Sequence, residues 1–310
     1  MALDELGIAA IGGHVPETRL DNREAAKRFD FSDEFLETKI GVLAPARKAS
    51  DEETSDLCVR AFADLERAAG ADLGNIDLIA VVTQNPDGHG LPHTSAIVHQ
   101  KLRLPKTCFA FDISLGCSGF VAGLAIVKGY LAATGGRRAI LFTADPYSKV
   151  QDPDDRNTAL IFGDGAAAVL IAETPHWRIG AAFDCGTDGQ RSSALRVDAE
   201  NRLSMNGRAV FDFCALNVPG SVERTLTANG LTKQDVDGWV LHPGSKYIVD
   251  TICDRLKIPR ISFPAAYGNT VSSSIPLILK GMDPLRQRTV LISGFGVGLG
   301  WATTVLRSAA

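Results

Sequence analysis

One cysteine of this 310-residue chain stands where a nucleophile could form. Cys117 lies in a Gly-Cys-Ser-Gly turn between two apolar runs, Phe109–Ile113 and Val121–Val127. We expect a buried strand, this turn and then a helix, which puts the thiol at a helix N-terminus. Free backbone N–H groups and the helix dipole favour thiolate there. Most cysteines are inert core residues, however, so the turn by itself supports nucleophile and packing about equally.

A histidine and an asparagine occupy comparable turns later in the chain. His242 follows the apolar segment Val236–Leu241, and Asn269 lies within Tyr267–Ser274. A neutral imidazole can polarise a carbonyl through its N–H, and an amide can donate to the same oxygen. Each residue also has a structural reading, a hydrogen-bonded strand end for the histidine and an ordinary turn for the asparagine.

An internal repeat puts these turns on a common scaffold. Three pairs of segments recur in the same order: Ile76–Val81 with Val236–Leu241, Arg103–Phe109 with Lys257–Phe263, and Phe162–Gly165 with Phe295–Gly298. Strands alternate with helices in each part, which predicts two related α/β halves, 1–172 and 173–310. Strand-to-helix turns of such halves meet at one centre, where α/β folds bind ligands. The glycine-rich Gly294–Gly298 would add backbone N–H groups beside that of Cys117.

Composition limits the class of partner. The chain is 45% apolar and 22% charged with a net charge of −4, enough to bury one large core or two fused halves. Without basic tracts, we expect neither nucleic acid nor a membrane as partner. We expect no signal peptide, and glycines interrupt the apolar stretch Val290–Leu306, which reads as strand–loop–strand. The six cysteines lack metal-ligand spacing, so we expect a cytoplasmic protein with reduced thiols, no metal and no cofactor.

Local patterns place further elements. Apolar spacing, caps and glycines predict a first strand over 5–13, helix N-caps at Asp21 and Asp33, an amphipathic helix over Leu57–Ala69, a strand over Asp77–Thr83, a helix near Thr94–Leu102, a strand over Arg138–Thr143 and a strand after Pro259.

Several segments together resemble the thiolase-fold condensing enzymes, most closely β-ketoacyl-acyl-carrier-protein synthase III. The matching segments, in the family's order over nearly the whole chain, are Asp112–Gly119, Asp155–Gly165, Met205–Phe211, Tyr267–Thr270, Ser274–Pro276 and Gly294–Trp301. The resemblance implies an α/β, thiolase-like αβαβα five-layered fold made of two duplicated halves, and a homodimer.

The resemblance also implies a reaction. An acyl-CoA would acylate Cys117, and a malonyl thioester, carried by acyl carrier protein or by CoA, would lose carbon dioxide to give the attacking carbanion. His242 and Asn269 would stabilise the enolate oxygen, while the Cys117 and Val297 amides hold the oxyanion. Such a β-ketoacyl synthase serves fatty-acid or specialised acyl and polyketide biosynthesis.

Residues outside the catalytic set follow from the same resemblance. Leu91 aligns with the position that reaches across the dimer and limits acyl-chain length. Arg156 aligns with an arginine that meets the CoA nucleotide, and Phe35, Lys39 and Ser245 are assigned to the same CoA-binding site. Phe35 and Lys39 stand where the family has tryptophan and arginine, and the lysine lacks the bidentate fork of arginine.

Two departures bear on the second substrate. The segment His242-Pro-Gly-Ser245 looks more like type III polyketide synthases. Tyr247 and Asp212 stand where the family has basic residues that contact the carrier protein, which leaves Lys246, Arg208 and Arg255 as a possible alternative patch. We hypothesise a specialised member that takes both substrates as CoA thioesters or serves a secondary pathway.

Two other functions remain open. The Cys117-bound acyl group could pass to an oxygen or nitrogen nucleophile, or the chain could be a non-catalytic partner of an active homologue. Retention of Asn269 favours decarboxylation, because acyl transfer without a carbanion has less need of a second donor. Retention of all three catalytic residue types argues against a silent subunit.

Overall fold

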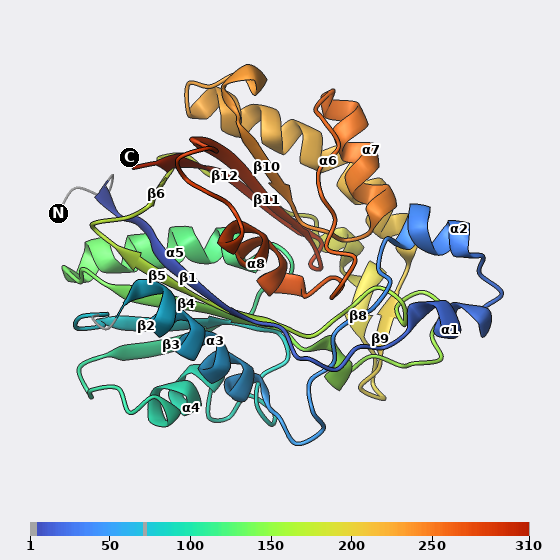
Figure 1. Ribbon diagram of the computed structural model, residues 1–310, viewed down its shortest axis with the longest axis horizontal. Helices are drawn as coiled ribbons and strands as arrows, with labels where there is room; N and C mark the ends of the chain where they lie inside the picture. Colours follow the sequence, from blue (N-terminus) through green and yellow to red (C-terminus); the bar gives the residue numbers. More distant parts are fainter. Residues whose placement is uncertain (1–4, 71–72, 310) are drawn as a thin grey trace.

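The computed structural model describes residues 5–70 and 73–309, which stack in five layers of helices and strands (Figure 1). Helices form the two outer layers and the middle one: α3 (Thr54–Ala69) with α4 (Thr94–Lys101), α6 (Gly207–Ala228) with α7 (Lys246–Leu256), and α5 (Gly119–Thr134) with α8 (Ser274–Lys280) between the strand layers. This is the αβαβα order that the sequence predicts.

The strands of the first half lie in the order β3-β2-β4-β5-β1. Their bounds are β1 Gly7–His14, β2 Leu78–Val82, β3 Phe109–Ile113, β4 Ala139–Ala144 and β5 Ala166–Ala172. β2 runs parallel to β3 and β4, whereas β5 runs antiparallel to β4 and β1. The carboxyl ends of β2, β3 and β4 therefore point the same way.

The second half has the order β10-β11-β12-β6, with β7 also paired to β12, and its described residues lack a counterpart of β3. Its strands are β6 Trp177–Ile179, β7 Asp184–Thr187, β10 Gly238–Leu241, β11 Thr289–Gly296 and β12 Gly300–Ser308. β10 and β11 are parallel, and β11 and β12 antiparallel. β6 pairs with β1 as well as β12, which links the two strand layers.

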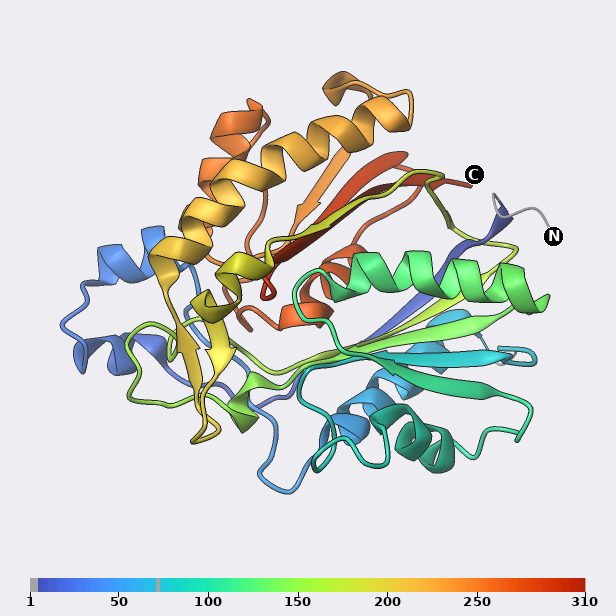
Figure 2. The same cartoon turned by 180° about the vertical axis from the view of Figure 1, so that it is seen from behind.

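The central helix α5 explains how the layers pack so closely (Figure 2). It touches β2 and β4 on one side and β11 and β12 on the other, so most of its surface must be apolar. A Cβ atom on Gly123 would lie 3.1 to 3.3 Å from side-chain carbons of Leu141 and Val82. Glycine at that position therefore lets α5 approach the first sheet.

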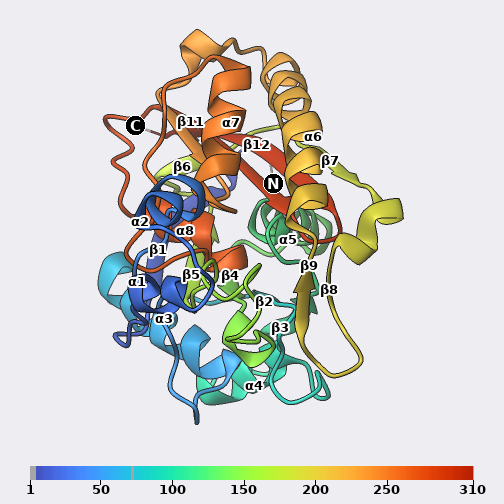
Figure 3. The same cartoon turned by 90° about the vertical axis from the view of Figure 1, so that its right-hand side faces the viewer.

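Short elements complete the fold. They are α1 (Asn22–Lys27), α2 (Asp33–Phe35), the π-helical turn η2 (Leu36–Ile40), the 3-10 turns η3 (Tyr147–Lys149), η4 (Gly189–Ala194), η5 (Lys233–Asp235) and η6 (Val271–Ser273), and the hairpin β8 (Leu195–Val197) with β9 (Leu203–Met205). Figure 3 shows the β8–β9 hairpin leading into the start of α6.

Two predicted strands need correction. β3 is an edge strand rather than a buried one, and the Phe109 side chain is 53% exposed. The segment 259–268 forms no strand. Proline has no N–H to donate to a strand ladder, and Pro264 interrupts the segment a second time. Instead, carbonyls of this segment accept hydrogen bonds from the N–H groups of residues 43–46.

Helix starts were predicted with mixed success. Asp21 caps α1 as expected, but Ser32 caps α2, and Asp33 is the first residue of that helix. α3 begins at Thr54, before the predicted Leu57, because a capping box between Glu53 and Asp56 satisfies its first N–H groups.

Candidate active site

A cavity of about 420 Å³ has Cys117, His242 and Asn269 in its wall. Cys117 follows β3, His242 follows β10, and Asn269 precedes α8, so three distant segments meet there. The structure thus brings together the three residues that the sequence repeat singled out. The turns that end β3 and β10, one from each strand layer, meet there with the segment before α8.

Cys117 lies in the turn that enters α5, and only 4% of it is exposed. Burial raises the pKa of the thiol to about 12, and the Asp145 carboxylate contributes to the rise. Hydrogen bonds from the backbone N–H groups of Val297 and of Cys117 itself lower the pKa, but by less. The expectation that the helix N-terminus favours thiolate is wrong for the resting site, because desolvation of the anion outweighs these donors. The resting thiol is protonated.

His242 is 1% exposed, and neither of its ring nitrogens has a hydrogen-bond partner among the residues that the structure describes. Its backbone N–H donates to the Ser293 carbonyl oxygen on β11. The imidazole and Phe295 rings form a T-shaped contact with centroids 5.8 Å apart. Burial lowers the pKa of His242 to about 3, so the imidazole is neutral. Two unpartnered nitrogens on a side chain that lines a cavity indicate a group that can bind a ligand.

Asn269 is 2% exposed, and its side chain has a fixed orientation. Its Oδ1 accepts from the Val271 N–H at 2.9 Å and from the Ser274 hydroxyl at 3.4 Å. Val271 holds a φ of 52°, which is uncommon for a β-branched residue. Because the amide oxygen is occupied, Nδ2 is the group that Asn269 can offer to a ligand.

The end of β11 presses directly on the nucleophile. A Cβ atom on Gly296 would lie 2.7 Å from Cys117 Sγ, and one on Gly294 would lie 2.5 Å from the Cys117 carbonyl oxygen. Gly296 also has a φ of 152°. Glycines are therefore required at both positions by close approach, and they bring the Val297 N–H to the thiol.

The predicted CoA-binding residues Phe35, Lys39, Arg156 and Ser245 line the same cavity. Lys39 Nζ lies 4.0 Å from the centre of the Tyr247 ring. The Ser245 side chain accepts from the Ile248 N–H and so caps α7.

Other cavity residues escaped the sequence analysis. Phe31 stacks on Phe35 with ring centroids 4.4 Å apart, and the Arg156 guanidinium lies 4.9 Å from the Phe31 centroid. One face of α6 also lines the cavity, with Gly207 and the side chains of Val210, Phe211 and Cys214. These positions are three or four residues apart, so they share one face of a helix. With the start of α6 known, this spacing would have predicted that they line one surface.

A buried carboxyl group lies behind the nucleophile. Asp145, at the end of β4, is fully buried and accepts from the Gln84 N–H at 3.1 Å and from the Asn85 amide at 2.9 Å. Burial raises the pKa of Asp145 to about 7. This residue ties loop 84–93 to the sheet, and its ionised form raises the pKa of the Cys117 thiol.

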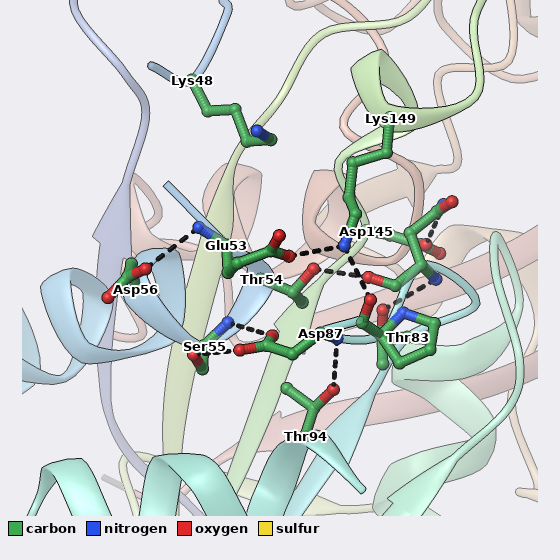
Figure 4. A network of polar contacts seen from close by, with 12 residues as sticks. Lys48, Glu53, Thr54, Ser55, Asp56, Thr83, Asp87, Thr94, Asp145 and Lys149 are labelled. Atoms are coloured by element: carbon green, nitrogen blue, oxygen red, sulfur yellow. Dashed lines mark hydrogen bonds and ion pairs between the residues drawn. The ribbon is translucent and has the colours of Figure 1, made fainter. Parts of the chain in front are cut away.

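Further polar contacts hold the same loop (Figure 4). The Asp87 carboxylate accepts from the Ser55 backbone and hydroxyl, and the Asp87 N–H donates to the Thr94 hydroxyl. Lys149 joins Glu53 to the Pro86 carbonyl. The base of the loop is thereby rigidly positioned.

The tip of this loop carries Leu91, which is 93% exposed and does not line the cavity of its own chain. Its assignment to an acyl pocket across a dimer stays a prediction.

Two absences hold for the part of the chain that the structure describes. No three His, Cys, Asp or Glu side chains there are grouped to hold a metal ion. No helix in the same residues is long and apolar enough to cross a bilayer.

Comparison with known proteins decides the family. The model described as 3-oxoacyl-[acyl-carrier-protein (ACP)] synthase III matches residues 111–189, and its C-terminal counterpart matches residues 226–308. β-Ketoacyl-[acyl-carrier-protein] synthase III 1 of Halalkalibacterium halodurans is 34% identical over 97% of this chain and 98% of its own. The chain belongs to the 3-oxoacyl-[acyl-carrier-protein] synthase III family.

Solved structures agree with the family. Synthase III of Thermus thermophilus is 33% identical, with a TM-score of 0.90 over 98% of this chain and 99% of that one. The priming β-ketosynthase of the R1128 polyketide pathway is 26% identical, with a TM-score of 0.86 over 98% and 96%. These matches confirm the thiolase-like fold, and they make this synthase III family member an acyl-transferring condensing enzyme, as predicted.

Proposed function

We propose that the protein joins an acyl group from acyl-CoA to a malonyl thioester by decarboxylative Claisen condensation, with Cys117 as the acyl carrier. The observation that carries the proposal is the meeting of Cys117, the unpartnered His242 ring and Asn269 at one buried cavity. A nucleophile and two neutral donors are what this two-step reaction requires.

The first step loads the enzyme. Cys117 Sγ attacks the thioester carbon, and the tetrahedral oxyanion accepts hydrogen bonds from the Cys117 and Val297 N–H groups. The carbon–sulfur bond to CoA then breaks, and the CoA thiolate takes the proton that Cys117 gives up. Because burial keeps the resting thiol protonated, its deprotonation accompanies substrate binding.

The second step forms the carbon–carbon bond. The malonyl carboxylate leaves as carbon dioxide, and the electron pair stays on the thioester as an enolate whose oxygen accepts from His242 and Asn269. The enolate carbon attacks the acyl carbon, and the Cys117 thiolate leaves and is reprotonated. A neutral His242 suits this role, since it donates without requiring a buried cation.

The rim of the cavity suits the CoA nucleotide. Phe35 offers a ring face, and Lys39 and Arg156 offer charge for phosphates. Ser245 adds a polar group at the start of α7.

We place the homodimer contact at the edge strand β3. On its outer side β3 pairs with no other strand of the described chain, and the exposed Phe109 ring stacks on Tyr130 of α5. An unpaired apolar edge favours pairing with a second copy. Loop 84–93 would then carry Leu91 into the partner's acyl pocket.

A cytoplasmic location and a reaction without metal or cofactor complete the proposal. All six cysteines are free, including the exposed Cys185, which suits a reducing compartment. The malonyl group arrives on acyl carrier protein or on CoA.

Intact-mass spectrometry after incubation with acyl-CoA tests the first step. Wild type should gain the mass of the acyl group, and Cys117→Ala should not. An acyl mass on the variant would disprove the nucleophile assignment, and no acyl mass on wild type would favour a non-catalytic subunit. Malonyl thioester then tests the second step, through carbon dioxide release and a 3-oxoacyl product. Acyl transfer to an alcohol or amine without carbon dioxide would instead establish the acyltransferase alternative.

A further inference from the structure

Two cations at the cavity rim have no carboxylate partner among the described residues. Lys39 Nζ lies over the Tyr247 ring, and the Arg156 guanidinium lies over the Phe31 ring. Both side chains line the cavity and are exposed. Ring faces hold these cations in place without neutralising them, so they remain available to an anion.

The cations on the neighbouring surface of α6 and α7 are already occupied. Arg208 pairs with Asp212 at 2.9 Å, and Lys246 pairs with Asp250 at 2.8 Å. Arg255 donates to the Ala215 carbonyl. Two of the three cations of the alternative basic patch considered from the sequence are therefore paired with carboxylates, and Arg255 alone keeps a charge without a carboxylate partner among the described residues.

Neutral aromatic surface fills the space between these ion pairs. Phe211 of α6 and Tyr247 of α7 stack with centroids 5.1 Å apart, and Tyr247 is 44% exposed. Lys39 and Arg156, by contrast, line the cavity itself, where a small ligand can reach their charge. The outer surface of the two helices offers no matching excess of charge.

From this distribution we infer that the malonyl group arrives as malonyl-CoA and not on a carrier protein. A CoA thioester brings its own adenine and phosphates to the aromatic-backed cations. A carrier-bound thioester brings a single phosphodiester, so its remaining affinity must come from the protein surface around the entrance.

The inference rests on the proposed function and fixes the product. Malonyl-CoA and the Cys117 thioester give 3-oxoacyl-CoA, carbon dioxide and free Cys117. The bond to the malonyl carboxylate breaks, its electron pair forms the new carbon–carbon bond, and the released thiolate takes one proton. A reaction that acts on a CoA-bound 3-oxoacyl group must consume this product.

The donor test starts from enzyme whose Cys117 has been acylated and checked by intact mass. Malonyl-CoA and malonyl-loaded acyl carrier protein, the latter shown to be active with another condensing enzyme, are compared by product formation. We expect kcat/KM to be at least about tenfold higher with malonyl-CoA than with the malonyl-loaded carrier protein. Equal or higher kcat/KM with the carrier overturns the inference but leaves the proposed function intact, whereas failure to acylate Cys117 overturns both.

Charge variants test the cause. Lys39→Ala and Arg156→Ala should each raise KM for malonyl-CoA roughly tenfold with little change in kcat. Lys246→Ala is the control: Lys246 follows the rim residue Ser245 but does not line the cavity and is ion-paired, so KM should change less than about twofold. Unchanged KM in both rim variants contradicts the inference.

A gain-of-function variant gives the converse test. Asp212→Lys adds a cation and releases Arg208, so we expect activity with the malonyl-loaded carrier to rise at least about fivefold. No rise in a variant that still acylates Cys117 would show that surface charge does not exclude the carrier.

Discussion

The cavity has a buried floor, formed by the three candidate catalytic residues, and an exposed rim, and the two differ in solvent exposure and charge. The floor, made of Cys117, His242 and Asn269, is at most 4% exposed, and each residue stands next to a strand end or a helix start. The rim includes Lys39 and Arg156, whose exposed charges rest on aromatic rings. The floor therefore works through burial, and the rim through charge that burial would suppress.

This difference decides the protonation states. On the floor, desolvation raises the pKa of the thiol and lowers that of the imidazole, so both groups are uncharged before any substrate binds. On the rim, permanent cations suit a substrate that is already charged. Substitutions should consequently affect rate on the floor and affinity on the rim.

The largest effect should come from the donors on the floor. Asn269→Ala and His242→Ala should each lower the condensation rate roughly 100- to 1000-fold, the usual result of removing one oxyanion donor. Cys117 should still be acylated, because these donors act on the enolate. Single-turnover assays separate the steps, and equal loss of acylation would contradict the division of roles.

The next largest effect should follow from filling the space beside the thiol. In Gly296→Ala the new methyl group would lie 2.7 Å from Cys117 Sγ at a φ of 152°, so acylation should fall roughly 100-fold. Gly129→Ala is the control, since nothing lies within 4 Å of its Cβ. It should keep acylation and raise the free energy of unfolding by about 0.5–1 kcal/mol.

The rim should respond through affinity. Phe35→Ala should raise KM for acyl-CoA about tenfold and leave kcat nearly unchanged, because ring stacking holds the substrate without touching the reacting atoms. An acyl-pantetheine substrate, which lacks the nucleotide, provides the control and should show no difference between variant and wild type. A lower kcat with unchanged KM would place Phe35 on the floor instead.

The smallest effect concerns the pH dependence of the floor. The rate of Cys117 alkylation should rise with pH beyond pH 9, since the pKa of the thiol is raised to about 12. The Asp145 carboxylate opposes thiolate formation, so Asp145→Asn should speed alkylation at pH 9 by roughly two- to tenfold. Slower alkylation in a variant with an unchanged circular dichroism spectrum would reverse the sign assigned to Asp145.

Local sequence predicted much of the scaffold because its signals are local. The apolar runs that form β2, β4 and β11, and the small residues that let α5 pack between two sheets, can be recognised without tertiary contacts. The repeat and the glycine turn likewise pointed to Cys117, His242 and Asn269.

Position within the sheet could not be predicted in the same way. An apolar run has the same sequence pattern in a central strand and in an edge strand. The sequence therefore predicts a buried strand at β3, although Phe109 is half exposed. The segment after Pro259 repeats the sequence of a strand, yet its carbonyls accept hydrogen bonds from residues 43–46 outside any strand.

The sequence by itself singled out Cys117, His242 and Asn269 as candidates, and it predicted the strand ends beside the first two, since both follow from local pattern and repetition. Only the tertiary structure decided their electrostatics. The thiol of Cys117 is enclosed by Gly296 and Val297 from the far end of the chain, and that burial reversed the expected thiolate. Desolvation depends on what packs around a group, and no local pattern contains it.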